Sequence, residues 1–87
     1  MPNKKGPKII GIVTHYYSNL GVAIVKFKAA VKVGEEVRFK GATTDFIQKI
    51  DSIQFNHKDI ASSKKGQEVG IKVSDKVREG DEILEVV

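Results

Sequence analysis

Cysteine is absent from this sequence of 87 residues. Neither a disulfide framework nor a thiolate metal site can therefore hold the chain together, and a reducing compartment is the ordinary expectation. No apolar run approaches the roughly 20 residues that span a bilayer, and the opening MPNKKGPK lacks the apolar middle of a signal peptide. We expect a cytoplasmic protein, a monomer, with no membrane partner.

Acidic residues are in the minority, with 11 Asp and Glu against 15 Lys and Arg, and the formal net charge is +4. This excess permits nucleic acid as a partner without requiring it. Only Arg38 and Arg78 are arginines, and lysine binds phosphate as a point charge without the fork that distinguishes bases. Any nucleic-acid binding should therefore depend little on base sequence.

Helical periodicity is also missing: no window shows a sustained i, i+3, i+4 apolar pattern, and residues 56–67 allow one turn of helix at most. Alternation of apolar and polar residues is common instead. Ala23, Val25 and Phe27 share one parity, and the same pattern returns in EVRFKG, where Val37 and Phe39 point inward. The chain is therefore predicted to be all-β.

Six short strands separated by glycine-containing turns predict a small closed β-barrel over residues 8–87, since closure removes exposed sheet edges. Residues 1–7, which contain both prolines, are predicted to be a flexible basic tail. The run 45–55 changes parity, which indicates a bulge near Asp51 and Ser52 or burial of both faces. The Gly-acid pairs at Gly34 and Gly80 are predicted to be turns in the scaffold, not a pair of catalytic carboxylates.

Four segments carry a family resemblance: IGIVTHYYSNLGVAIVKFKAAVKVGEEVRFKG, IDSIQF, ASSKKGQEVGIKV and VREGDEILEV. Together they resemble the second domain of translational GTPases such as elongation factor Tu. Through VTHYYSNLGVAIVK and TTDFIQKIDSIQ, the chain is also similar to the C-terminal barrel of collagenase-like U-family peptidases, which are linked to RNA modification. Both resemblances imply a six-stranded barrel of the translation-protein type.

The resemblance also sets expectations for function. In the elongation factor this barrel helps to hold the aminoacyl end of tRNA, and an acid that contacts the terminal adenosine aligns with Gln54. In the peptidases the active site lies in another domain, so no catalytic residue carries over. The phosphate-binding loop G-x-x-x-x-G-K-[ST] does not occur, so no nucleoside triphosphate is expected as a ligand.

A few residues could in principle serve catalysis or metal binding. His15, His57 and Asp59 offer ligands or a base, but their spacing matches no known motif. The polar stretches 43–45 and 62–65 contain hydroxyls without a partnered base and are predicted to be loops. Of Tyr16 and Tyr17, one is expected in the core and one half-exposed, although an exposed ring could stack a base. We expect no enzymatic activity, no cofactor and no metal.

The outward cations suggest a binding face. Lys26 and Lys28 share one side of a strand, Arg38 and Lys40 share one side of the next, and a short connection suggests that the two strands are adjacent. These four cations, with Gln54, are predicted to bind tRNA or rRNA. The alternative is a protein-docking module for a ribosomal, GTPase or RNA-modification partner, with no nucleic-acid contact.

Overall fold

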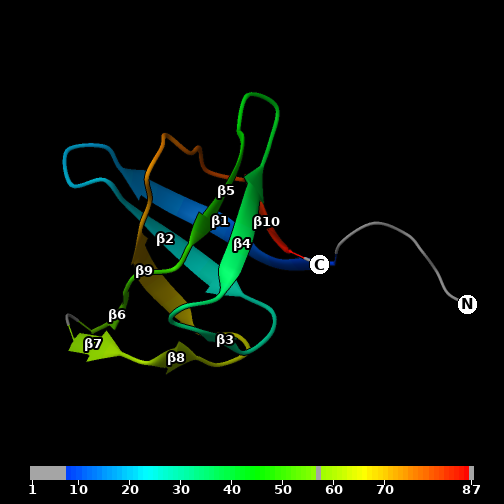
Figure 1. The fold of residues 1–87 in the computed structure, drawn as a ribbon. Helices are drawn as coiled ribbons and strands as arrows, with labels where there is room; N and C mark the ends of the chain where they lie inside the picture. The colour runs from blue at the N-terminus through cyan, green and yellow to red at the C-terminus, as the bar shows by residue number, and fades with distance from the viewer. Residues whose placement is uncertain (1–7, 57, 87) are drawn as a thin grey trace, which may run out of the picture.

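The computed structural model describes residues 8–56 and 58–86, which form only strands, turns and irregular segments (Figure 1). The predicted basic tail, His57 and Val87 lie outside the described residues. The strands are β1 (Ile9–Tyr17), β2 (Val22–Phe27), β3 (Val31–Lys32), β4 (Glu36–Lys40), β5 (Asp45–Lys49), β6 (Ile53–Phe55), β7 (Lys58–Ile60), β8 (Ser62–Ser63), β9 (Glu68–Lys72) and β10 (Glu82–Glu85). The all-β prediction is confirmed. No helix within the described ranges is long and apolar enough to cross a membrane.

Eight strands form one antiparallel sheet in the order β5-β4-β10-β1-β2-β9-β6-β7, and β3 pairs with β8 as a separate ribbon. The predicted closed six-stranded barrel is therefore wrong, because within residues 8–56 and 58–86 no backbone ladder joins the two ends of this sheet. Two short strands, β7 and β8, also occupy the segment for which a turn of helix was allowed. In Figure 1 the β4–β5 hairpin stands at one side, and β3, β6, β7 and β8 lie together below it.

The run 45–55 is two strands and not one. β5 pairs with β4, whereas β6 pairs with β7 and β9. The parity change falls between Ile50 and Ile53, both of which are buried, while Ile47 is exposed. Because the chain leaves one partner and joins another at Asp51 and Ser52, the expected irregularity is a strand break.

One side-chain amide connects the open flank of β5 with the end of β9. The Gln48 Nε2 atom donates to the Lys72 carbonyl oxygen at 2.8 Å, and its Oε1 atom accepts from the Ser74 N–H at 2.7 Å. A primary amide can present a donor and an acceptor side by side, as the backbone of a strand does. Gln48 thus ties β5 to the end of β9 by two side-chain hydrogen bonds, without a backbone ladder between these strands.

The core follows the predicted alternation. Ala23, Val25 and Phe27 on β2 and Val37 and Phe39 on β4 are each at most 1% exposed. Their polar neighbours along each strand face outward, because successive side chains of a strand point to opposite faces. The inner face of the curved sheet is therefore the core, and any binding surface lies on the outer face, at the edges or in the loops.

The two Gly-acid turns are part of the scaffold, as predicted. Gly34 and Gly80 have φ angles of 99° and 92°, which non-glycine residues rarely adopt. The acids that follow them differ in burial, since Glu35 is exposed and Asp81 is only 5% exposed. The Asp81 carboxylate accepts the Arg78 N–H at 2.8 Å and closes the turn before β10.

Candidate functional site

The predicted cationic face is not built as the sequence suggested. Strands β2 and β4 are separated by β10 and β1, so the expected adjacency is wrong. One row across the outer face runs Lys40, Glu82, Ile12, Lys26, Glu68 in register. Three strand spacings place Lys26 about 14 Å from Lys40 at the backbone. Each of these two lysines also has a glutamate as its neighbour in the row, so no continuous cationic surface joins them.

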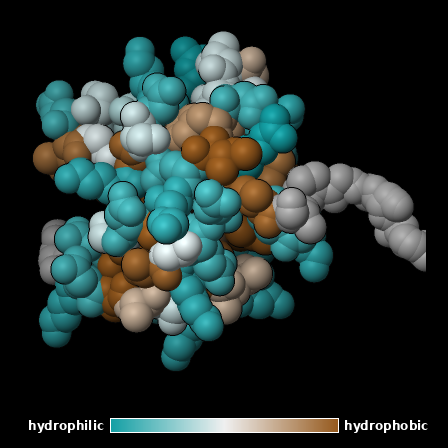
Figure 2. All heavy atoms as spheres, viewed as in Figure 1, coloured by the Kyte–Doolittle hydropathy of each residue, from teal (hydrophilic) through white to brown (hydrophobic). Residues whose placement is uncertain are grey.

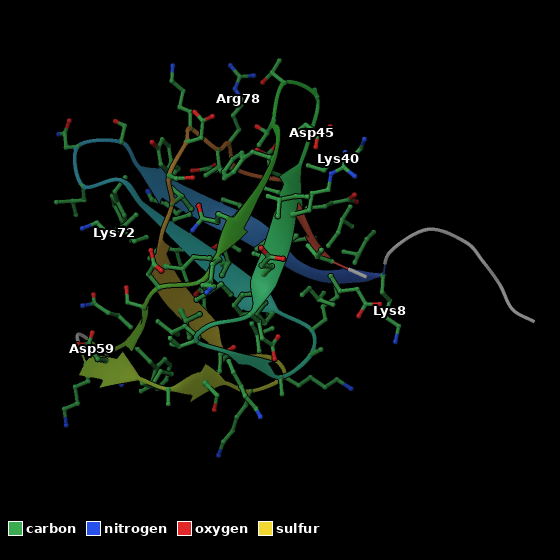
Figure 3. All side chains as sticks on the ribbon, in the orientation of Figure 1. Lys8, Lys40, Asp45, Asp59, Lys72 and Arg78 are labelled. Atoms are coloured by element: carbon green, nitrogen blue, oxygen red, sulfur yellow. The ribbon has the colours of Figure 1, made fainter. Side chains whose placement is uncertain are left out.

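Arg38 is engaged by a side chain on the next strand. Its Nε and Nη2 atoms donate to the two carboxylate oxygens of Asp45 at 2.7 and 2.8 Å. This hydrogen bond, with the attraction between the charges, lowers the pKa of Asp45 and raises the pKa of Arg38. Figure 3 shows Asp45 near Lys40 at the end of the β4–β5 hairpin. A bidentate fork of this kind leaves Arg38 fewer donors for a phosphate.

Gln54 lies on β6 with its side chain exposed, next to β7. Its Nε2 atom donates to the Asp59 carboxylate at 3.1 Å, which orients the amide across the hairpin. Asp59 is at the lower left of Figure 3, well away from Lys40. Gln54 lines a hollow of the surface, whereas the other four predicted site residues, the cations, do not line that hollow.

A groove runs over β9 between β2 and β6, and its floor is Gly70. We call it the Gly70 groove. Two adjoining hollows, of about 330 and 360 Å³, share the residues Leu20, Val22, Gln54 and Gly70. A Cβ atom at Gly70 would lie 3.4 Å from Ile24 Cδ1 and 3.5 Å from Val22 Cγ1. The missing side chain therefore leaves open the space between the side chains of β2 and the backbone of β6.

The upper wall of the Gly70 groove is the tip of the β1–β2 hairpin. Leu20 is 66% exposed and Tyr17 46% exposed, and both line the groove. Figure 2 shows hydrophobic surface at this tip, set among hydrophilic residues. Tyr16, by contrast, packs against the core, so the expectation of one inner and one half-exposed ring is confirmed. Gln54 and the exposed Asn56 add polar groups to the opposite wall.

The residues that could have served catalysis lie apart. His15 Nδ1 lies 3.1 Å from a carboxylate oxygen of Glu79, and the His15 ring lies 4.7 Å from that of Tyr17, on an exposed surface. Thr44 and Ser63 are buried, and the Ser63 hydroxyl has no hydrogen-bond partner among the residues that the structure describes. No group of three or more His, Cys, Asp or Glu residues that could hold a metal occurs among residues 8–56 and 58–86.

The Gly70 groove was missed because its parts are far apart in the sequence. Leu20, Gln54 and Gly70 meet only through the pairing of β2 with β9 and of β9 with β6. One local signal was available, since a glycine inside a strand often marks a place where side chains or a ligand approach the backbone closely.

Solved structures define the class of the fold. The C-terminal domain of a U32 peptidase from Geobacillus thermoleovorans superimposes with a TM-score of 0.86, over 91% of this chain and 92% of that one, at 23% identity. The selenomethionine variant of that domain gives a TM-score of 0.84, over 90% of this chain and 99% of that one. The chain is thus an all-β domain with the fold of a U32 peptidase C-terminal domain. No protein-family model matches it.

The curated relatives agree with this class. A Methanocaldococcus jannaschii protein named as an uncharacterized protease is 37% identical over 75 residues, which are 85% of this chain and 18% of that protein. A collagenase of Porphyromonas gingivalis is 33% identical over 76 residues, covering 85% of this chain and 21% of the relative. The chain therefore spans about a fifth of the length of these relatives.

These comparisons correct the predicted function. The resemblance to the C-terminal barrel of collagenase-like peptidases is confirmed, whereas that to the second domain of elongation factor Tu is not supported. The interpretation as a stand-alone translation-factor-like module that binds tRNA or rRNA is wrong, because the relatives are named as proteases and collagenases. The partners given with that interpretation, among them a ribosomal, GTPase or RNA-modification protein, are not tested by these comparisons.

Proposed function

We propose that this chain is a non-catalytic β domain of the collagenase-like peptidase type, and that it binds polypeptide in the Gly70 groove. The relatives are named as proteases and collagenases, which act on polypeptides, and they are about five times as long as the match. The domain would hold a substrate chain for a catalytic site located elsewhere.

The geometry of the Gly70 groove is the observation that carries the proposal. Peptide-binding grooves combine apolar contacts for side chains with hydrogen-bonding groups for the backbone. Here Leu20 and Tyr17 supply exposed apolar surface, and the Gln54 amide retains an oxygen and a second N–H beyond its bond to Asp59. Gly70 keeps the floor at backbone level, so an extended chain can approach β9 closely.

Binding of denatured collagen and casein to the purified chain tests the groove. Gly70→Val should fill the floor without backbone strain, because Gly70 is not among the glycines with positive φ. We expect this variant and Leu20→Ala to weaken binding at least about fivefold, on the scale of one lost apolar side-chain contact of roughly 1 kcal/mol. Ile47→Ala is the matched control, since Ile47 is another exposed apolar residue, on β5. Equal affinity in all four proteins would refute the groove as the site.

The absence of catalysis is tested separately with a fluorogenic gelatin substrate. We expect no hydrolysis above a mock purification. His15 is the residue to change if activity is found, because its contact with Glu79 is the one histidine–carboxylate pair among the described residues. Activity that follows the protein through a final sizing column and is lost in His15→Ala would show that the chain itself is an enzyme.

A further inference from the structure

A second hollow, of about 420 Å³, lies on the outer face beside the end of β2. We call it the lysine-rimmed hollow. Its lining residues are Ile12, Thr14, Lys26, Phe27, Lys28, Lys65 and Gly66. It adjoins the carboxyl end of β2, whereas the Gly70 groove adjoins the amino end of the same strand at Val22. Neither the proposed function nor the relatives' names assign it a role.

The hollow is formed where the turn before β9 folds against β2. Gly66 has a φ of 85°, and its N–H donates to the Phe27 carbonyl oxygen at 2.7 Å, while the Phe27 N–H donates to the Gln67 carbonyl oxygen at 3.2 Å. These two bonds fix Lys65 beside the strand end. On the other side, the Lys28 N–H donates to the Ile10 carbonyl oxygen at 2.7 Å and holds the chain against β1.

The floor of the hollow is apolar. Ile12 is only partly buried, although its neighbours Gly11 and Val13 are buried, and it faces outward from β1 directly opposite Lys26 on β2. The surface of the lining is mostly carbon. The lysines contribute to it, because the methylene groups of a lysine can lie along the protein surface while its ammonium group reaches water. An apolar side chain entering here would exchange water for carbon contacts.

The rim is positive. Lys26, Lys28 and Lys65 surround the floor, and none of the three has a carboxylate within ion-pair distance among the residues that the structure describes. Glu68 is opposite Lys26 in the ladder, and its carboxylate accepts the hydroxyl of the lining residue Thr14 at 2.7 Å, so one acid lies at the edge of the hollow. Glu82, the other acid of this row, stands opposite Ile12 on the side away from the lysines. The cations therefore outnumber the acids around the opening.

From this combination we infer that the lysine-rimmed hollow binds an acidic polypeptide segment, with one apolar side chain inserted over Ile12 and flanking carboxylates paired with the lysines. The positive rim favours acidic residues in the bound segment, because opposite charges attract, and the apolar floor favours an apolar side chain between them. Single-stranded RNA fits less well, because such strands stack their bases on exposed aromatic rings and Phe27 is only 1% exposed. The site is independent of the Gly70 groove.

A labelled peptide in which one leucine is flanked by glutamates probes the hollow by fluorescence anisotropy. Changing its glutamates to glutamines, or its leucine to serine, should each weaken binding. In the protein, the double change Lys28→Gln and Lys65→Gln should raise Kd about three- to tenfold, the effect of two exposed ion pairs. Lys40→Gln with Lys76→Gln makes the same change of charge at exposed positions outside the hollow and should leave Kd nearly unchanged.

Several outcomes would overturn the inference. Equal losses in the two double variants would mean non-specific charge attraction, and no binding of the peptide would remove the site. An RNA oligomer that binds more tightly than the peptide and loses affinity with Lys28→Gln and Lys65→Gln would assign the hollow to nucleic acid.

Two further variants have expected results. Ile12→Thr keeps a β-branched strand residue and should weaken binding of the acidic peptide. Gly70→Val should bind the acidic peptide as the unchanged protein does, which separates this test from that of the Gly70 groove.

Discussion

Replacing Gly41 by alanine tests how tightly the turn before β10 is packed. Gly41 follows β4 and has no positive φ, so alanine imposes no backbone strain there. Its Cβ atom would overlap Oδ1 of Asp81 and lie 2.6 Å from Asp81 Cγ. The carboxylate would have to move, although it is only 5% exposed and accepts the Arg78 N–H at 2.8 Å.

The size of the effect follows from the bond that must break. A hydrogen bond to a charged group contributes about 1.5–3 kcal/mol, so we expect Gly41→Ala to lose about 2 kcal/mol of unfolding free energy. For a domain of this size that corresponds to a Tm lower by about 8–16 °C. Circular dichroism and differential scanning calorimetry measure it. Gly70→Ala is the control, because its Cβ atom meets its nearest neighbour at 3.4 Å, an ordinary contact.

A double-mutant cycle identifies the cause. Asp81→Ala removes the group with which the new methyl collides, so Gly41→Ala should cost much less in that background than in the unchanged protein. The coupling between the two changes should reach about 1 kcal/mol or more, as for residues in direct contact. Strictly additive losses, or a Tm for Gly41→Ala within about 2 °C of the parent, would refute the reasoning.

Three further predictions concern single side chains. The pKa of Asp45, measured by NMR titration, should lie below its ordinary value and return toward that value in Arg38→Gln. Because the pKa of Asp45 is lower in the folded state than in the unfolded state, the ion pair stabilises the fold above about pH 4. This stabilisation is lost as the pH falls through the folded-state pKa. Gln48→Ala should lower stability by about 1–2 kcal/mol for two hydrogen bonds, and should speed hydrogen exchange of the Ser74 amide. Ser63→Ala should leave stability unchanged or raise it by about 1 kcal/mol, because a buried hydroxyl without a partner is removed.

Each of these has a clear contrary result. An Asp45 pKa that does not respond to the arginine change would show that the fork is not populated in solution. Unchanged exchange at Ser74 in Gln48→Ala would mean that the amide does not bridge β5 and β9. A loss above about 1 kcal/mol in Ser63→Ala would indicate a hydrogen bond that the buried hydroxyl makes.

The sequence determined the local structure of this domain. The alternation of Ala23, Val25 and Phe27 specified which side of β2 is buried. Successive side chains of a strand point to opposite faces, so these three side chains are buried together only if their shared face is the inner one. The glycines at 34 and 80 specified turns, because few other residues adopt their φ angles. These features depend on neighbours in the chain, and they were predicted correctly.

Tertiary structure decided which strands are neighbours. A short connection between β2 and β4 suggested adjacency, yet β1 and β10 lie between them, which separates Lys26 from Lys40. The same pairing brings together Leu20, Gln54 and Gly70, whose spacing in the sequence carries no sign of a shared groove. Alternation of apolar and polar residues indicates on which face of the sheet a side chain lies, but not which strands pair with each other. Partners are chosen by packing and hydrogen bonding across the whole sheet, so the binding surfaces became visible only in the folded chain.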